Sequence, residues 1–142
     1  MNGVLRLRVI EGELPRLVEF VEKFAECCEL PDAERARLLI ILEELFTNTV
    51  RYGYPEGASD GRIKVALAIM AGQIEIDFSD DGQPFDPLAQ RSPEFGRPSS
   101  ERMVGGLGLH IVRSLVDGAR YRRDGDRNQL TLVRRLARAN GG

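Results

Sequence analysis

Apolar and polar residues follow a pattern that predicts elements in the order β, α, α, β, β, α, β, β. Over residues 4–10 apolar side chains alternate with arginines, which is typical of a half-buried strand. Over residues 15–28 and 33–52 apolar side chains recur at spacings of three and four, which predicts two amphipathic helices. Pro15 suits the first turn of the earlier helix, where a missing N–H costs nothing. Asp32 is a candidate N-cap for the later one.

The second half of the chain is predicted to contain two hairpins with one helix between them. Two hairpins are predicted, with strands at 62–70 and 73–80 and at 119–123 and 129–136. Between the hairpins, helical spacing returns over residues 107–116, and Gly118 is a candidate C-cap. Helices that bracket antiparallel strand pairs predict an α/β (α+β) two-layer sandwich.

Length, charge and cysteine usage narrow the class of protein. A chain of 142 residues is long enough for a single domain, 1–142, with its own core. The 20 Lys and Arg against 22 Asp and Glu give a net charge of −2, so no overall basic field favours direct nucleic-acid binding. The longest apolar stretch is far short of a membrane span, and the N-terminus lacks a signal-peptide pattern. Cys27 and Cys28 would point about 100° apart on a helix, which disfavours a mutual disulfide. We therefore expect a cytoplasmic location.

One edge of the predicted helix 33–52 carries polar residues at a spacing of four. Glu44, Asn48 and Tyr52 lie along this edge, beside the apolar stripe. Helix interiors disfavour asparagine, so Asn48 has a specific reason to be there. Two interpretations stay open: a solvated edge in which Asn48 bonds to a neighbour, or one wall of a binding site.

Two further segments stand apart from an ordinary core. Asp80 ends a predicted strand, where its carboxylate can face a pocket, and Gly82 would allow a ligand or backbone to approach closely. A simple turn is the alternative. Gly105, Gly106 and Gly108 precede or open a helix, whose free N–H groups and dipole favour anions such as phosphate. A hinge is the alternative there, since the spacing of a Walker loop is absent.

In this order and spacing, the three segments resemble the ATP-binding Bergerat fold shared by gyrase, the heat-shock-90 chaperones and sensor histidine kinases. Within that superfamily the chain looks most like the bacterial anti-sigma factor serine/threonine kinases, and the Pro-Phe-Asp-Pro run at 84–87 adds to the similarity. The resemblance covers nearly the whole chain. It implies a histidine kinase-like ATPase domain of order βααββ-lid-αββ, a mixed sheet with helices on one face, and an ATP lid at about residues 86–104.

The resemblance also implies a role for each motif. It implies that Asn48 binds Mg²⁺, which suits a hard amide oxygen, and that Glu44 is the general base that takes the proton of a serine hydroxyl. Asp80 would accept a hydrogen bond from the adenine amino group. The remaining nucleotide-binding positions that the resemblance implies are Arg51, Tyr52, Gly82, Phe85, Gly105, Gly106, Leu107, Gly108 and Leu109.

Three positions depart from the family pattern. Tyr52 stands where many relatives have histidine, and Val104 stands where some have an arginine that touches the terminal phosphate. Asn128 falls nearest to a threonine that often helps to hold adenine. The nearest alternatives to the missing arginine are Arg91, Arg97 and Arg102. The first two departures leave the efficiency of phosphoryl transfer open.

The function implied by the resemblance is an ATP-binding anti-sigma factor with serine protein kinase activity. It would use ATP and Mg²⁺, sequester a sigma factor and phosphorylate an anti-anti-sigma partner of the STAS type. Relatives are commonly homodimers, and no nucleic-acid or membrane partner is expected. Two alternatives stay open: an ATP-binding partner-switch module without kinase activity, and an interaction domain that has lost ATP. ATP binding separates the last from the others, and phosphate transfer separates the first two.

Overall fold

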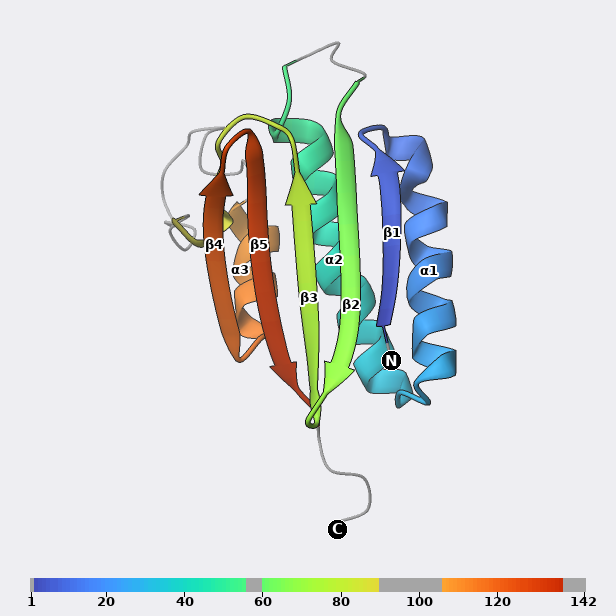
Figure 1. Ribbon diagram of the computed structural model, residues 1–142. Coiled ribbons are helices and arrows are strands. Elements are labelled where there is room, and N and C mark those ends of the chain that lie inside the picture. Colours follow the sequence, from blue (N-terminus) through green and yellow to red (C-terminus); the bar gives the residue numbers. More distant parts are fainter. Residues whose placement is uncertain (1, 56–59, 90–105, 137–142) are drawn as a thin grey trace.

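A computed structural model of the chain describes residues 2–55, 60–89 and 106–136, which form a five-stranded sheet with helices on one face (Figure 1). In chain order the elements are β1 (Asn2–Arg8), α1 (Leu14–Cys27), α2 (Asp32–Tyr52), β2 (Arg62–Met70), β3 (Gln73–Asp80), α3 (Gly106–Ser114), β4 (Gly118–Asp124) and β5 (Arg127–Arg135), with short 3-10 turns at Glu11–Glu13 and Pro87–Ala89. This order and the placement of the helices confirm the two-layer α/β prediction.

The sheet is wholly antiparallel, so the expectation of a mixed sheet is wrong. The strand order is β1-β2-β3-β5-β4, and each of the four neighbouring pairs is antiparallel. Strands β3 and β4 run in the same direction and are connected through α3. A strand–helix–strand connection of this kind usually places the two strands side by side as a parallel pair. Here β5 folds back from β4 and lies between them, so no two parallel strands become neighbours.

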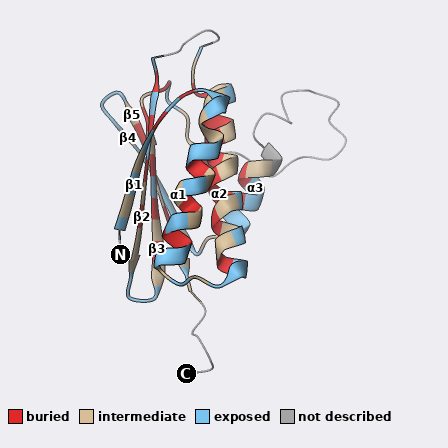
Figure 2. Ribbon diagram, turned by 90° about the vertical axis from the view of Figure 1, so that its right-hand side faces the viewer, coloured by how far each residue is buried: buried red, intermediate tan, exposed pale blue. Residues whose placement is uncertain are grey.

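The core fills the space between the sheet and the helices (Figure 2). Along β2, Ile63, Val65 and Leu67 are at most 1% exposed, while the alternate residues face solvent. The apolar stripe of α2 lies against this sheet face and is also buried. Burial of this kind contributes roughly 1.5–3 kcal/mol per large apolar side chain. One sheet face is therefore apolar and covered, and the other is polar and open.

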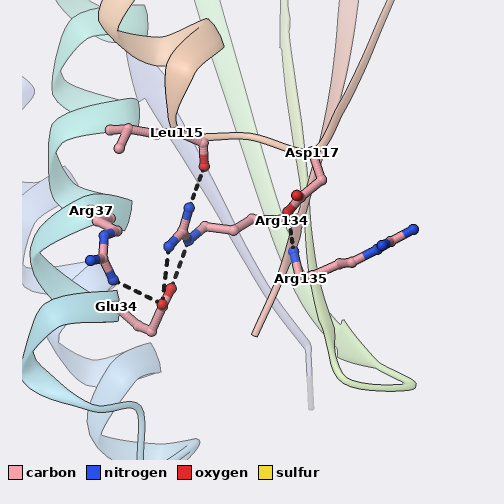
Figure 3. Close-up of polar contacts among 6 residues, drawn as sticks. All are labelled: Glu34, Arg37, Leu115, Asp117, Arg134 and Arg135. Atoms are coloured by element: carbon pink, nitrogen blue, oxygen red, sulfur yellow. Dashed lines mark hydrogen bonds and ion pairs between the residues drawn. The ribbon is translucent and has the colours of Figure 1, made fainter. Parts of the chain in front are cut away.

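An ion pair between the buried Glu34 and the half-buried Arg134 attaches the first turn of α2 to the end of β5 (Figure 3). The guanidinium of Arg134 donates to both carboxylate oxygens of Glu34, at 2.7 and 3.1 Å, and its third nitrogen donates to the carbonyl of Leu115 at 2.6 Å. Arg37 adds a contact to Glu34 at 3.0 Å. The hydrogen bonds from Arg134 hold the pKa of Glu34 below its ordinary value, although burial acts in the opposite direction. Thus α2, the residues after α3 and β5 are joined at one end of the molecule.

Outside the β2–β3 hairpin, most element ends differ from the predictions by one or two residues. β1 ends at Arg8, because it pairs with β2 only as far as Arg8 opposite Arg62, where β2 begins. Asp32 is the first residue of α2, and the N-cap position belongs to Pro31, which makes no side-chain cap. Gly118 opens β4 and does not cap α3. None of the described helices combines the length and the apolar character needed to cross a membrane.

Candidate functional site

A small cavity lies where α2, the end of β3 and α3 meet. It is lined by Leu45, Asn48, Thr49, Phe78, Asp80, Phe85, Pro87, Leu109, Tyr121, Asn128 and Leu130. Four of the predicted site residues therefore share one cavity: Asn48, Asp80, Phe85 and Leu109. Its volume of about 20 Å³ holds one water molecule. A larger ligand requires the lining side chains to move apart.

Asn48 presents a buried oxygen with unused bonding capacity. Its side chain is held in one orientation, because Nδ2 donates to the carbonyl oxygen of Glu44 at 2.7 Å. The opposite atom, Oδ1, is buried and has no hydrogen-bond partner among the described residues. A buried acceptor without a partner costs about 1–3 kcal/mol, so this oxygen calls for a partner such as a water molecule or a cation. An amide oxygen is a hard neutral ligand of the kind that Mg²⁺ accepts, so Asn48 Oδ1 could contribute one ligand to such an ion.

The start of α3 packs directly on the polar edge of α2. Glu44 lies one helical turn before Asn48 and is half-buried. A Cβ atom at Gly108 would overlap Oε2 of Glu44 and would lie 3.6 Å from Nδ2 of Asn48. A larger residue at this position would require the Glu44 side chain to move away. An anion bound at the N-terminus of α3 would therefore lie beside both side chains of α2.

Asp80 is a buried carboxylate at the end of β3. It is 6% exposed, and its Oδ1 accepts hydrogen bonds from the N–H of Gly82 at 2.9 Å and from Nδ2 of Asn128 at 3.0 Å. Burial raises the pKa of Asp80 above its ordinary value, against the effect of these two hydrogen bonds. Among the described residues no hydrogen bond reaches Oδ2. That oxygen is available to a donor group in the cavity.

The neighbouring Asp81 has a structural role. Its Oδ1 accepts from the hydroxyl of Tyr54 at 2.5 Å and from the N–H of Arg62 at 2.9 Å. Partial burial raises the pKa of Asp81, but these hydrogen bonds outweigh it and hold the pKa below its ordinary value. Burial also raises the pKa of Tyr54 above its ordinary value. Asp81 thus connects the residues after α2 to the start of β2, and it does not line the cavity.

Asn128 is a site residue that the sequence did not reveal. It is 4% exposed and lies directly opposite Asp80 in the β3–β5 register. Besides Asp80, its Nδ2 contacts the carbonyl of Gln83 at 2.8 Å, and its Oδ1 accepts from the N–H of Phe85 at 3.2 Å and the hydroxyl of Tyr121 at 2.5 Å. One amide group therefore fixes the cavity wall after β3. Its nearness to the threonine position of the resembled family is the only sequence signal.

Gly82 provides a close approach between backbones. A Cβ atom there would overlap the carbonyl oxygen of Gly53, just after α2. The next residue, Gln83, donates its N–H to Gly53 and its Nε2 to the carbonyl of Tyr52, both at 2.9 Å. The half-buried Tyr52 thus takes part through its backbone and does not line the cavity.

Some of the remaining predicted residues lie away from the cavity or at the start of α3, and the others lie outside the described residues. Arg51 is exposed, with its Nε 3.9 Å from the carboxylate of Glu11, and is not among the residues around the cavity. Gly106 and Leu107 form the first turn of α3. Gly105, Val104 and most of the predicted lid, including Arg91, Arg97 and Arg102, lie outside the described residues.

Comparison with known proteins identifies similar chains. The model of the histidine kinase-like ATPase domain family matches residues 10–134. The serine-protein kinase RsbW of Listeria monocytogenes serovar 1/2a is 36% identical over 85 residues, which cover 56% of this chain and 53% of that protein. RsbW of Staphylococcus epidermidis is 33% identical over 82 residues, which cover 55% and 52%. The chain thus spans about half the length of these relatives.

Solved structures show the same fold. The RsbU and RsbW domains of Rv1364c from Mycobacterium tuberculosis superpose with a TM-score of 0.69 at 20% identity, over 97% of this chain and 33% of that one. The blue-light activated histidine kinase EL346 of Erythrobacter litoralis gives a TM-score of 0.56 at 22% identity, over 79% and 33%. These similarities confirm the predicted Bergerat-type fold.

Proposed function

Because this chain belongs to the histidine kinase-like ATPase family, we propose that it binds ATP between α2, β3 and α3 and transfers phosphate to a serine of a partner protein. The observation that carries the proposal is the contact of Gly108 with Glu44 and Asn48. The Glu44 carboxylate and the amide nitrogen of Asn48 therefore lie beside the first turns of α3, and a helix N-terminus is a place where phosphate groups bind favourably. The other atom of that amide, Oδ1, is buried without a partner among the described residues. The relatives named serine-protein kinase RsbW support the choice of serine as acceptor.

Asp80 is the proposed determinant of adenine recognition. Its Oδ2 accepts no hydrogen bond from the described residues, whereas Oδ1 accepts two. An ionised carboxylate only accepts hydrogen bonds. It therefore suits the amino group of adenine and disfavours the carbonyl that guanine has at the same position. Phe85 and Leu109 supply apolar walls of the cavity. The small present volume means that adenine must displace part of this lining.

The phosphates are proposed to lie at the first turn of α3. Gly106, Leu107 and Gly108 would present backbone N–H groups there, and the helix dipole adds to the attraction. Asn48 Oδ1 would hold Mg²⁺, which when bound neutralises part of the phosphate charge. Residues 86–104 would form the lid, and Gly105, Arg51, Tyr52 and Gly82 complete the proposed nucleotide-binding set.

Glu44 is the proposed general base. It lies beside the N-terminus of α3 and therefore beside the proposed phosphate position. As the serine oxygen bonds to the terminal phosphorus, the hydroxyl proton passes to the Glu44 carboxylate and ADP leaves. The neighbouring Glu43 points to another side of the helix, so a substitution there is a control for a substitution of Glu44.

The proposed partners follow from the resemblance to anti-sigma factor kinases. We propose that the chain sequesters a sigma factor, that its substrate is an anti-anti-sigma protein of the STAS type, and that it acts as a homodimer in the cytoplasm. Support comes from the relatives named RsbW and from the structural similarity to the RsbU and RsbW domains of Rv1364c.

Phosphate transfer from radiolabelled ATP to a candidate STAS-type partner tests the proposal, with ATP binding measured in parallel. Glu44→Ala is expected to lower the transfer rate by about 10²–10⁴ while ATP affinity stays within a few-fold of that of the original chain. Glu43→Ala is the matched control and should retain transfer. Full transfer by Glu44→Ala would remove this residue as the base. ATP binding without transfer by the unaltered chain would favour the partner-switch module without kinase activity.

A further inference from the structure

A wide hollow lies beside the open face of the sheet, and its lining also includes Glu13 and Arg16 at the start of α1. It has a volume of about 640 Å³ and lies at the end of the sheet where β1 ends and β2 and β5 begin; Figure 1 looks onto this face. Its lining consists of Arg6, Leu7, Arg8, Glu13, Arg16, Arg62, Ile63, Lys64, Ser79, Arg127 and Gln129. Cationic side chains predominate, and Glu13 is the one carboxylate among the described residues of this lining. We call it the basic hollow.

The strand register places like charges directly opposite one another in the basic hollow. Arg6 pairs with Lys64, and Arg8 pairs with Arg62, on the same face of the antiparallel β1–β2 pair. Directly opposed like charges destabilise a sheet. Two successive pairs of this kind weaken the fold locally. An anionic ligand that neutralises them would offset this cost.

The cations of the basic hollow mostly lack carboxylate partners within the chain. Among the described residues, Arg6, Arg8 and Lys64 form no ion pair, and Arg127 donates to the hydroxyl of Ser79 at 3.2 Å. The exception is Arg16, which pairs with Glu13 at 2.8 Å. Several arginines elsewhere on the described surface do pair with carboxylates, for example Arg35 with Glu22 and Arg134 with Glu34. The hollow therefore gathers several cations without an ion-pair partner among the described residues, although Arg8 interacts electrostatically with Glu13, and Arg127 with Asp80 and Asp81.

We propose that the basic hollow binds a short acidic segment, rich in Asp and Glu, of a partner protein. Charge complementarity selects an anionic occupant. Within the part of the chain that the structure describes, the lining has no aromatic side chain on which a nucleic-acid base can stack, and the net charge of the chain is −2. Further along the same face of β3, Asp77 is exposed and Glu75 is half-exposed. These two carboxylates would repel a long polyanion, so the occupant is short.

This inference is independent of the proposed ATP site. Ser79 and Asp80 are adjacent in β3, but Ser79 lines the basic hollow whereas Asp80 lines the cavity on the helix side. Arg6 and Lys64 contribute nothing to that cavity. A failure of peptide binding and a failure of ATP binding are therefore separate results.

A fluorescein-labelled peptide of ten glutamates, followed by fluorescence anisotropy at low ionic strength, tests the proposal. The double variant Arg6→Gln with Lys64→Gln is expected to weaken peptide binding by about tenfold, and the affinity should fall with added salt. The control variant Arg120→Gln with Arg135→Gln removes the same charge from exposed residues of β4 and β5 outside the basic hollow. It should change the affinity by less than about twofold.

Thermal unfolding accompanies the binding measurement. Because Arg6→Gln with Lys64→Gln removes an opposed pair of like charges, its Tm should equal or exceed that of the original chain. Weaker peptide binding by a variant of undiminished stability supports the proposal. It is overturned if the original chain does not bind the peptide, or if both double variants lose affinity equally. It is also overturned if a ten-nucleotide oligo-dT binds more tightly than the peptide and depends on Arg6 and Lys64.

Discussion

Asp80 and Asp81 are neighbours in the sequence, yet their carboxylates lie in opposite environments. Burial raises the pKa of Asp80, whereas the hydroxyl of Tyr54 and the N–H of Arg62 overcome partial burial and lower the pKa of Asp81. The first carboxylate therefore destabilises the fold when ionised, and the second stabilises it. A destabilising group that lines a cavity is a candidate for binding, and Asp80 fits that description.

Asp80→Asn is expected to weaken ATP binding by about 10- to 100-fold, because an amide can present a donor where the adenine amino group needs an acceptor. Calorimetry on this variant checks the prediction. Asp77→Asn, on the opposite face of the same strand, is the matched control and should bind ATP normally. Unchanged affinity in Asp80→Asn would remove Asp80 from the site.

The same variant carries a stability prediction with a defined sign. Since the pKa of Asp80 is higher in the folded chain than its ordinary value of 3.8, the folded state binds more protons than the unfolded state between these two values. The free energy of unfolding therefore falls as pH rises from 3.8 through the folded pKa, and the cost persists at neutral pH. Asp80→Asn should remove this cost, so its Tm at pH 7 should equal or exceed that of the original chain. A clear drop in Tm at pH 7 would contradict this prediction.

Some residues of the site could be predicted from the sequence, and others could not. Asn48, Asp80 and Gly108 could be proposed from the sequence because each belongs to a local motif with a defined spacing. Asn128 could not, because its role depends on the register between β3 and β5, which brings it opposite Asp80 across 48 positions of sequence. Local patterns do not encode such a pairing.

At the scale of elements, α2 is the part of the molecule that must be held in place. Its last turn is fixed by Gln83, which contacts the backbone of Tyr52 and Gly53. Its first turn is fixed by the ion pair of Glu34 and Arg134. Between these ends, its polar edge contacts α3. The position of this edge relative to α3 thus depends on contacts at both ends of one helix.

Arg134→Met is expected to lower the free energy of unfolding by about 3–5 kcal/mol, because Glu34 would keep a buried charge without its main partner. Lys23→Met, which breaks the exposed pair with Glu19, should cost at most about 1 kcal/mol. Urea unfolding at pH 7 measures both. A cost for Arg134→Met as small as that for Lys23→Met would contradict the assignment of this pair to the stability of α2.

The pH dependence of this ion pair has the opposite sign to that of Asp80. The pKa of Glu34 is lower in the folded chain than its ordinary value of 4.5. Its contribution is therefore fully present above pH 4.5 and is lost as pH falls through the lowered folded value. The difference in unfolding free energy between the original chain and Arg134→Met should shrink on acidification through this range.

Periodicity predicted the helices and hairpins well, since each depends on the pattern of its own residues. The hairpin of β2 and β3 has the bounds that alternation gave. The ends of β1 and α2 and the role of Gly118 were less accurate, because they depend on pairing partners and on Pro31 as the N-cap. The mixed sheet was wrong for the same kind of reason: the position of β5 between β3 and β4 is a property of the whole sheet.

At the scale of the whole molecule, the sheet separates two surfaces. The helix side holds the cavity with Asn48 and Asp80, and the open side holds the basic hollow. The strand alternation that buries Ile63 also exposes Lys64, so one segment serves both sides. Nucleotide binding and partner binding are thus proposed on opposite faces of the sheet. The treatment of 1–142 as one domain stays a prediction from length and pattern.

Asn48 and its neighbours are proposed to form a nucleotide site. Titration of ATP by calorimetry, with and without Mg²⁺, tests it most directly, on the original chain, Asn48→Ala and the adjacent control Thr47→Ala. We expect Mg²⁺-dependent binding that Asn48→Ala weakens by about tenfold or more and that Thr47→Ala leaves intact. Absence of ATP binding by the original chain, or Mg²⁺-dependent binding that is unchanged in Asn48→Ala, would contradict the claim.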